Sequence, residues 1–159
     1  MKSVTKTIIT LALMPCLYFF PLTIVQANTV NTKVTAQQND LKQLNQLWLA
    51  YQDQILVMDK ALNTLKNQAD EVQKNATISL YIKKIDQTKT AINRLILTQN
   101  NAQLLRQQMI EHATKYQNVY RLATATQPNP HQLNMVQRLT AQTDVLYQKM
   151  KATAQVLYS

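Results

Sequence analysis

The chain has 159 residues, a formal net charge of +9 and no glycine. The lack of glycine argues against folds that need it at hairpin turns, bulges and phosphate-binding loops. The sequence therefore predicts an all-α protein with one domain after an N-terminal signal. The basic charge favours acidic partners, such as anionic lipids, nucleic acid or an acidic protein face, or it serves solubility alone.

Residues 1–27 have the pattern of a secretory signal peptide. Two lysines precede a mostly apolar run from Ile8 to Val25, and Val25-Gln26-Ala27 fits a cleavage site. An uncleaved membrane anchor is the alternative, but two prolines interrupt the run and it is short for a membrane span. We therefore predict cleavage after Ala27, a periplasmic or secreted location and a mature domain over 28–159. The only cysteine, Cys16, lies in the signal, so the mature chain has no thiol chemistry.

The stretch from Leu41 to Val72 predicts one long amphipathic helix. Apolar residues recur there at alternating spacings of three and four, which is a heptad seam. The seam consists of Leu41, Leu44, Trp48, Tyr51, Ile55, Met58, Leu62, Leu65, Ala69 and Val72. Four more apolar residues widen its first half: Leu47, Leu49, Leu56 and Val57. This width predicts two neighbouring helices in the first half and one beyond Met58.

The seam loses its phase at Asn75-Ala76-Thr77. We interpret the shift as a tight turn in which Thr77 caps the next helix, with a stutter in one continuous helix as the alternative. The first two helices are then expected over about 33–74 and 77–125, with Asn100-Asn101 as the weakest point of the second.

Gln127-Pro128-Asn129-Pro130 ends the second helix, because the residue before a proline disfavours helical geometry. Asn129 as N-cap and Pro130 at the first helical position begin a third helix over about 130–157. Short connections make neighbouring helices antiparallel. The sequence therefore predicts an antiparallel three-helix bundle with long helices. Helices 1 and 2 extend from it as a coiled-coil-like hairpin over about 60–92.

Few residues are arranged for chemistry. No carboxylate pair lies at helical spacing in an apolar setting, and His112 and His131 lack the neighbours that a metal site needs. The mature chain has only two serines and no cysteine. We therefore predict no catalytic residue, no metal site and no cofactor, and a protein that is not an enzyme.

Two sets of residues remain as binding candidates. Lys83, Lys84 and Lys89 lie near the expected hairpin tip, where they serve a partner or simply form a solvated surface. Gln99 and Arg106 occupy seam positions of the second helix. We interpret these two as fixing helix register, with Arg106 near Trp48, or alternatively as lining a polar pocket or a bend.

Together these features predict a non-enzymatic periplasmic helical interaction or adaptor protein of the bacterial cell envelope. Its expected partner is another envelope protein, and self-association through the hairpin or contact with an anionic surface are further candidates. Nucleic acid is not favoured, because aromatic residues are not interleaved with the lysines. The alternatives are a periplasmic holdase-type chaperone and a minor component of a secretion or conjugation (pilus-associated) apparatus.

Overall fold

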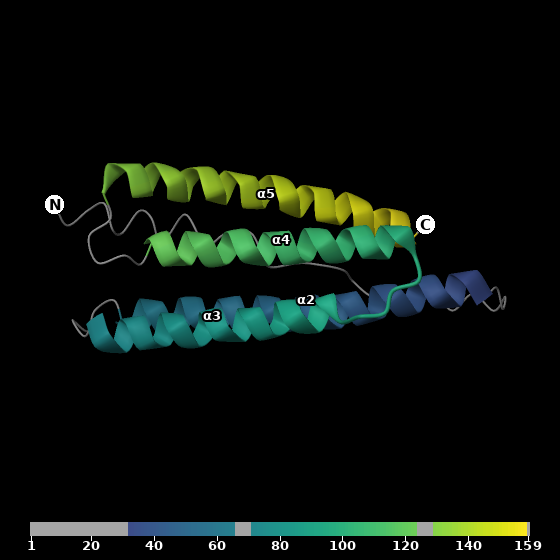
Figure 1. Ribbon diagram of the computed structural model, residues 1–159, viewed down its shortest axis with the longest axis horizontal. Coiled ribbons are helices and arrows are strands. Elements are labelled where there is room, and N and C mark those ends of the chain that lie inside the picture. The colour runs from purple at the N-terminus through teal and green to yellow at the C-terminus, as the bar shows by residue number, and fades with distance from the viewer. Residues whose placement is uncertain (1–31, 66–70, 124–128, 159) are drawn as a thin grey trace.

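A computed structural model of the protein describes residues 32–65, 71–123 and 129–158 (Figure 1). The regular elements in these ranges are α2 (Thr32–Leu65), α3 (Glu71–Asn93), α4 (Asn100–Ala123) and α5 (Pro130–Tyr158). Consecutive helices run in opposite directions, α2 packs most closely on α3, and α4 on α5. The all-α prediction is confirmed for the described residues, which form four helices where three were predicted.

The core follows the heptad seam of α2. Its first six members, from Leu41 to Met58, are all buried, as predicted. The side chains of Leu62, Leu65 and Ala69 lie outside the described residues. α4 and α5 contribute the other side of the core with Ala102, Leu105, Met109, Tyr116, Val136, Tyr147, Met150 and Leu157. Apolar burial at helical spacing therefore holds the bundle together.

The predicted single helix over 77–125 is wrong, because residues 94–99 are not helical. The amide of Leu95 bonds to the Ile92 carbonyl at 3.3 Å in a tight turn, and the amide of Gln103 bonds to the Gln99 carbonyl at 3.0 Å as α4 begins. The break contains neither glycine nor proline. Tertiary contacts stabilise it instead, as described below, and such contacts override local helix propensity.

The predicted turn at Asn75-Ala76-Thr77 is also wrong, because all three residues lie inside α3. Thr77 does not cap a helix. Its hydroxyl donates to the Gln73 carbonyl at 2.9 Å, which is the usual bond of a threonine within a helix. The first helix therefore does not reach Lys74. Val72 belongs to α3 and is 80% exposed, so the seam does not extend to it.

The predicted projecting hairpin is wrong as well, because α4 packs against α3 between Ile82 and Lys89. Three of the four apolar residues that widen the seam are exposed on α2, namely Leu49, Leu56 and Val57. Leu47 packs against the core. The extra width of the α2 face therefore does not mark a buried surface in this chain.

The start of α5 is a reciprocal capping box, which confirms the predicted N-cap. Asn129 Oδ1 accepts from the Gln132 amide at 2.9 Å, and Gln132 Oε1 accepts from the Asn129 amide at 2.9 Å. Pro130 follows at the first helical position, where its missing N–H costs nothing. Local sequence alone therefore sets this helix end.

The Asn129→Ala variant should unfold at a lower urea concentration, with about 1 kcal/mol less free energy of unfolding, because the Gln132 amide loses its acceptor. The matched change Asn134→Ala, on the exposed face of the same helix, should have an effect within about 0.5 kcal/mol. Equal losses in the two variants would contradict the capping role.

Candidate functional site

The connection between α3 and α4 is held by a buried carboxylate from α2. Asp40 is only 2% exposed, and its Oδ2 accepts three hydrogen bonds. They come from the Thr98 amide at 2.7 Å, the Thr98 hydroxyl at 3.0 Å and the Gln99 amide at 2.9 Å. These amides lie just before α4, so the carboxylate also faces the positive end of the helix dipole. Asp40 therefore acts as a cap supplied by a distant helix.

Two side chains of α4 satisfy the carbonyls of the same connection. Arg106 Nη1 donates to the Leu95 carbonyl at 3.0 Å, and Gln103 Nε2 donates to the Leu97 carbonyl at 3.3 Å. The six residues 94–99 are therefore fixed from both sides, by α2 and by α4. Buried or half-buried backbone groups need such partners when they leave a helix.

Gln99 and Arg106 thus come together at this connection, whereas Trp48 does not join them. The Gln99 carbonyl accepts from the Gln103 amide as α4 begins, and Arg106 donates to the Leu95 carbonyl. Trp48 lies in a separate aromatic cluster. The two polar seam positions therefore mark a helix break that lies just before Asn100-Asn101.

A buried histidine lies at the centre of that aromatic cluster. The His112 ring is 5.3 Å from Trp48, 6.0 Å from Tyr51, 6.0 Å from Tyr116 and 6.4 Å from Tyr147, measured between ring centroids. Tyr51 Oη and His112 Nδ1 lie 3.3 Å apart as a hydrogen-bonded pair. The cluster joins α2, α4 and α5 and lies deep in the core.

Burial lowers the pKa of His112 to about 4, because the charged imidazolium loses its hydration there. Histidine usually titrates near 6.5. His112 is therefore neutral at pH 7, and it packs as an aromatic ring that carries one hydrogen bond. Asp59 on α2 shows the opposite shift, since partial burial raises its pKa to about 7.

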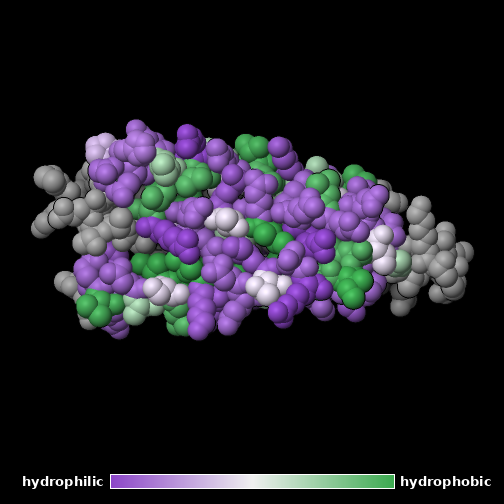
Figure 2. All heavy atoms as spheres, viewed as in Figure 1, coloured by the Kyte–Doolittle hydropathy of each residue, from purple (hydrophilic) through white to green (hydrophobic). Residues whose placement is uncertain are grey.

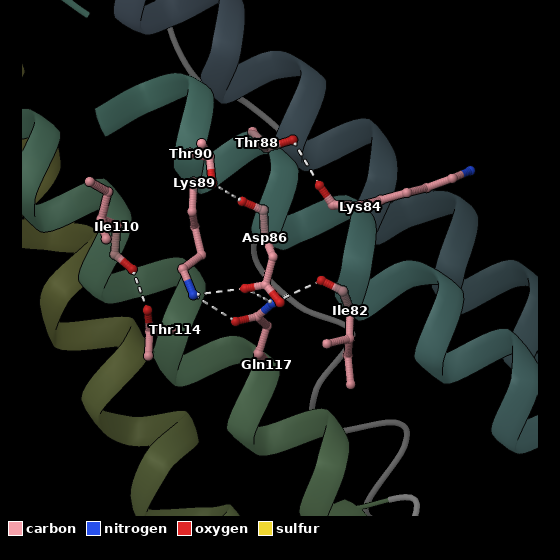
Figure 3. A network of polar contacts seen from close by, with 9 residues as sticks. All are labelled: Ile82, Lys84, Asp86, Thr88, Lys89, Thr90, Ile110, Thr114 and Gln117. Atoms are coloured by element: carbon pink, nitrogen blue, oxygen red, sulfur yellow. Dashed lines mark hydrogen bonds and ion pairs between the residues drawn. The ribbon is translucent and has the colours of Figure 1, made fainter. Parts of the chain in front are cut away.

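The predicted lysines lie along the middle of α3, not at a tip. Figure 3 shows two of them, Lys84 and Lys89. Lys89 Nζ donates to Asp86 Oδ1 at 3.1 Å and to Gln117 Oε1 at 2.9 Å. Lys84 Nζ lies 5.0 Å from the centroid of the Tyr81 ring, and Lys83 is exposed. Two of the three lysines are therefore engaged within the bundle.

Gln117 is the buried residue that ties α4 to α3 (Figure 3). Its Nε2 donates to the Ile82 carbonyl and to Asp86 Oδ1, both at 3.0 Å. Desolvation alone would raise the pKa of Asp86. The hydrogen bonds from Gln117 and Lys89, with the charges of Lys89 and Arg121, outweigh it and lower that pKa. The carboxylate thus keeps its charge as part of this network.

Among the described residues, no group of three His, Cys, Asp or Glu side chains is placed to hold a metal ion. Within the same ranges, none of the helices combines the length and apolar character that crossing a membrane requires. His131 is exposed at the start of α5. The predicted signal peptide, residues 1–27, lies outside the described residues.

Comparison of the chain with protein-family models, with curated proteins and with solved structures finds no match.

Three buried polar residues of this subsection were not among the candidates predicted from sequence: Asp40, His112 and Gln117. His112 had a detectable signal, because it continues the spacing of Leu105 and Met109 toward Tyr116. Asp40 and Gln117 had none, because their partners lie on other elements far along the chain.

The Asp40→Ala variant should lose about 2 kcal/mol or more of unfolding free energy in urea, because two backbone amides lose their only charged acceptor. Asp40→Asn should lose less, since the amide oxygen still accepts. Asp53→Ala, an exposed change on the same helix, should be nearly neutral. If Asp40→Ala and Asp53→Ala have equal stability, the capping role of Asp40 is wrong.

His112 should make the protein less stable as the pH falls. Its folded pKa of about 4 lies below the unfolded value of 6.5, so only the unfolded chain takes up this proton between those values. The contribution of His112 to the free energy of unfolding is fully present above pH 6.5. This contribution falls by up to about 3 kcal/mol as the pH drops to 4.

The measurement is urea unfolding of the wild-type chain and of His112→Phe between pH 7.5 and 4. The raised pKa of Asp59 gives the opposite trend, because its stabilising term is lost as the pH rises through about 7. Both chains contain Asp59, so its pH-dependent contribution cancels when their free energies of unfolding are subtracted. His112→Phe should therefore gain stability relative to the wild type as the pH falls. A difference between them that does not vary with pH would refute the assignment.

Proposed function

We propose that this chain is a non-enzymatic periplasmic helical interaction or adaptor protein of the bacterial cell envelope. The observation that carries the proposal is the exposure of Ile96. This side chain is 87% exposed, yet it lies in the connection that Asp40, Arg106 and Gln103 hold in place. A large aliphatic residue on a fixed connection is suited to fill a pocket of a partner protein.

The fixed connection supports this proposal energetically. Binding orders flexible loops at a free-energy cost, and a segment that is already ordered avoids that cost. The neighbours of Ile96 in the chain, Leu95 and Leu97, are half-buried and buried, so Ile96 alone of the three points outward. The hydrogen bonds on Leu95 and Leu97 therefore present Ile96 in one position.

The charge around Ile96 indicates the chemistry of the partner. Arg94 is exposed two residues before Ile96, and the whole chain is basic. A fitting partner has an apolar pocket with acidic residues at its rim, because opposite charges speed encounter and select the orientation. On the face shown in Figure 2, hydrophobic residues form separate patches among hydrophilic ones, which suits a local protein contact. The periplasmic location rests on the predicted signal peptide.

Photocrosslinking in the native cell tests the proposal. A photoreactive residue in place of Ile96 should give a discrete crosslinked product with an envelope protein. The same residue in place of Val145, which is 58% exposed on α5, should give none. Ile96→Asp should weaken binding of that partner at least about tenfold, because the carboxylate enters an apolar, acid-rimmed pocket.

Circular dichroism and urea unfolding check that Ile96→Asp is folded like the wild-type chain. Equal crosslinking from both positions, or unchanged binding of Ile96→Asp, would refute the proposed contact.

A holdase-type chaperone is a second candidate, favoured by the number of exposed apolar side chains. They occur on all four helices and the connection: Leu49, Leu56, Val57, Val72, Leu80, Ile96, Leu104, Val145 and Val156. Dispersed apolar contacts suit unfolded clients of no fixed shape. A holdase would suppress aggregation of a reduced client protein, and Ile96→Asp would leave that suppression unchanged. An adaptor would not suppress the aggregation, and Ile96→Asp would weaken binding of its partner.

A further inference from the structure

The outward face of α2 carries a stripe of six exposed side chains that lie outside the core of the bundle. The stripe consists of Leu49, Asp53, Leu56, Val57, Lys60 and Thr64. At about 100° per residue these positions fall within roughly one third of the helix circumference, opposite the buried seam residues Ile55 and Met58. At 1.5 Å per residue the stripe is about 22 Å long.

Leu56 and Val57 form the apolar centre of this stripe. They are 39% and 49% exposed, and Leu49, two turns earlier, is 42% exposed. Covering such side chains is favourable in proportion to the apolar area that is removed from water. The stripe therefore favours an occupant that has a short apolar strip of its own.

Two opposite charges flank the apolar centre at equal distances. Asp53 lies three residues before Leu56, and Lys60 lies three residues after Val57. Among the described residues, neither charged side chain has an ion-pair partner. Both charges are therefore available to a molecule that binds the stripe.

A second copy of the same helix, running antiparallel, matches this arrangement. A twofold axis between residues 56 and 57 places Leu56 opposite Val57 of the second copy. The same axis places Asp53 opposite Lys60 of the second copy, and it does so twice because such a contact is isologous. A parallel pairing would instead place each of these charges opposite its own equivalent. The charges therefore favour the antiparallel arrangement.

We propose that this chain forms a weak antiparallel homodimer through the outward face of α2, with two Asp53–Lys60 ion pairs between the copies. One pair of helices in contact buries less surface than an obligate dimer does. The dimer therefore dissociates on dilution, and unfolding of dilute protein reports on the monomer.

This surface is separate from the proposed contact at Ile96. The centre of the dimer contact lies about four and a half turns of α2 from Asp40, which holds the connection that carries Ile96. Either proposal can therefore fail without the other.

Exchange of the two charges tests the partner and the orientation together. In Asp53→Lys and in Lys60→Asp, like charges face each other across the axis, so each variant should dimerise about tenfold more weakly than the wild type. An equimolar mixture of the two variants should form a heterodimer about as tight as the wild-type dimer, because each lysine then faces an aspartate. Sedimentation equilibrium of the purified chains, over a concentration series up to millimolar, measures these association constants.

Lys149→Asp is the matched control, because it makes the same charge change at an exposed position of α5. It should dimerise like the wild type, and circular dichroism checks that all the variants are folded. If a variant does not fold, the concentration series of the wild type still decides whether the dimer exists. The proposal is overturned by a wild-type chain that stays monomeric at every concentration, by single variants that dimerise as tightly as the wild type, or by a mixture no tighter than the single variants.

Discussion

The Asp40 carboxylate is the interaction on which the topology of this bundle depends. It accepts from the Thr98 and Gln99 amides, the first polar groups that a break between α3 and α4 would otherwise leave unpaired. Without such an acceptor, helix continuation through residues 94–99 would satisfy the same amides locally. A single buried charge on α2 thus allows the chain to reverse where neither glycine nor proline occurs, and it converts one long helix into two.

Elsewhere in the bundle, amide side chains link neighbouring helices, a role that ion pairs often have in proteins. The 132 residues after the predicted signal include 33 asparagines and glutamines, and several of them bridge helices. Gln117 joins α4 to α3, Gln54 accepts from Thr88 between α2 and α3, and Gln37 donates to the Leu157 carbonyl between α2 and α5. Neutral bridges of this kind avoid the desolvation cost of buried charges. They fix helix register without disulfides or a strong charge pattern.

The sequence predicted what local patterns determine and missed what distant contacts determine. The heptad seam identified the buried face of α2 up to Met58, and Asn129-Pro130 located the start of α5. The break at 94–99 was missed because its causes, Asp40 and Arg106, lie on other helices. The misplaced turn at Asn75 has a related origin. A change of seam phase shows that the partner face changes, but it does not locate the residue where the chain turns.

α2 takes part in two buried polar contacts of the bundle. Within four turns it places Asp40 against the α3–α4 connection and Tyr51 against His112. One group faces the connection and the other faces α4, so both contacts form only when α2 lies at one depth and one rotation. Apolar seams tolerate sliding by a turn, whereas directional hydrogen bonds do not. The seam residues therefore supply the attraction that brings α2 into the bundle, and the polar residues between them select the one register in which Ile96 is held outward.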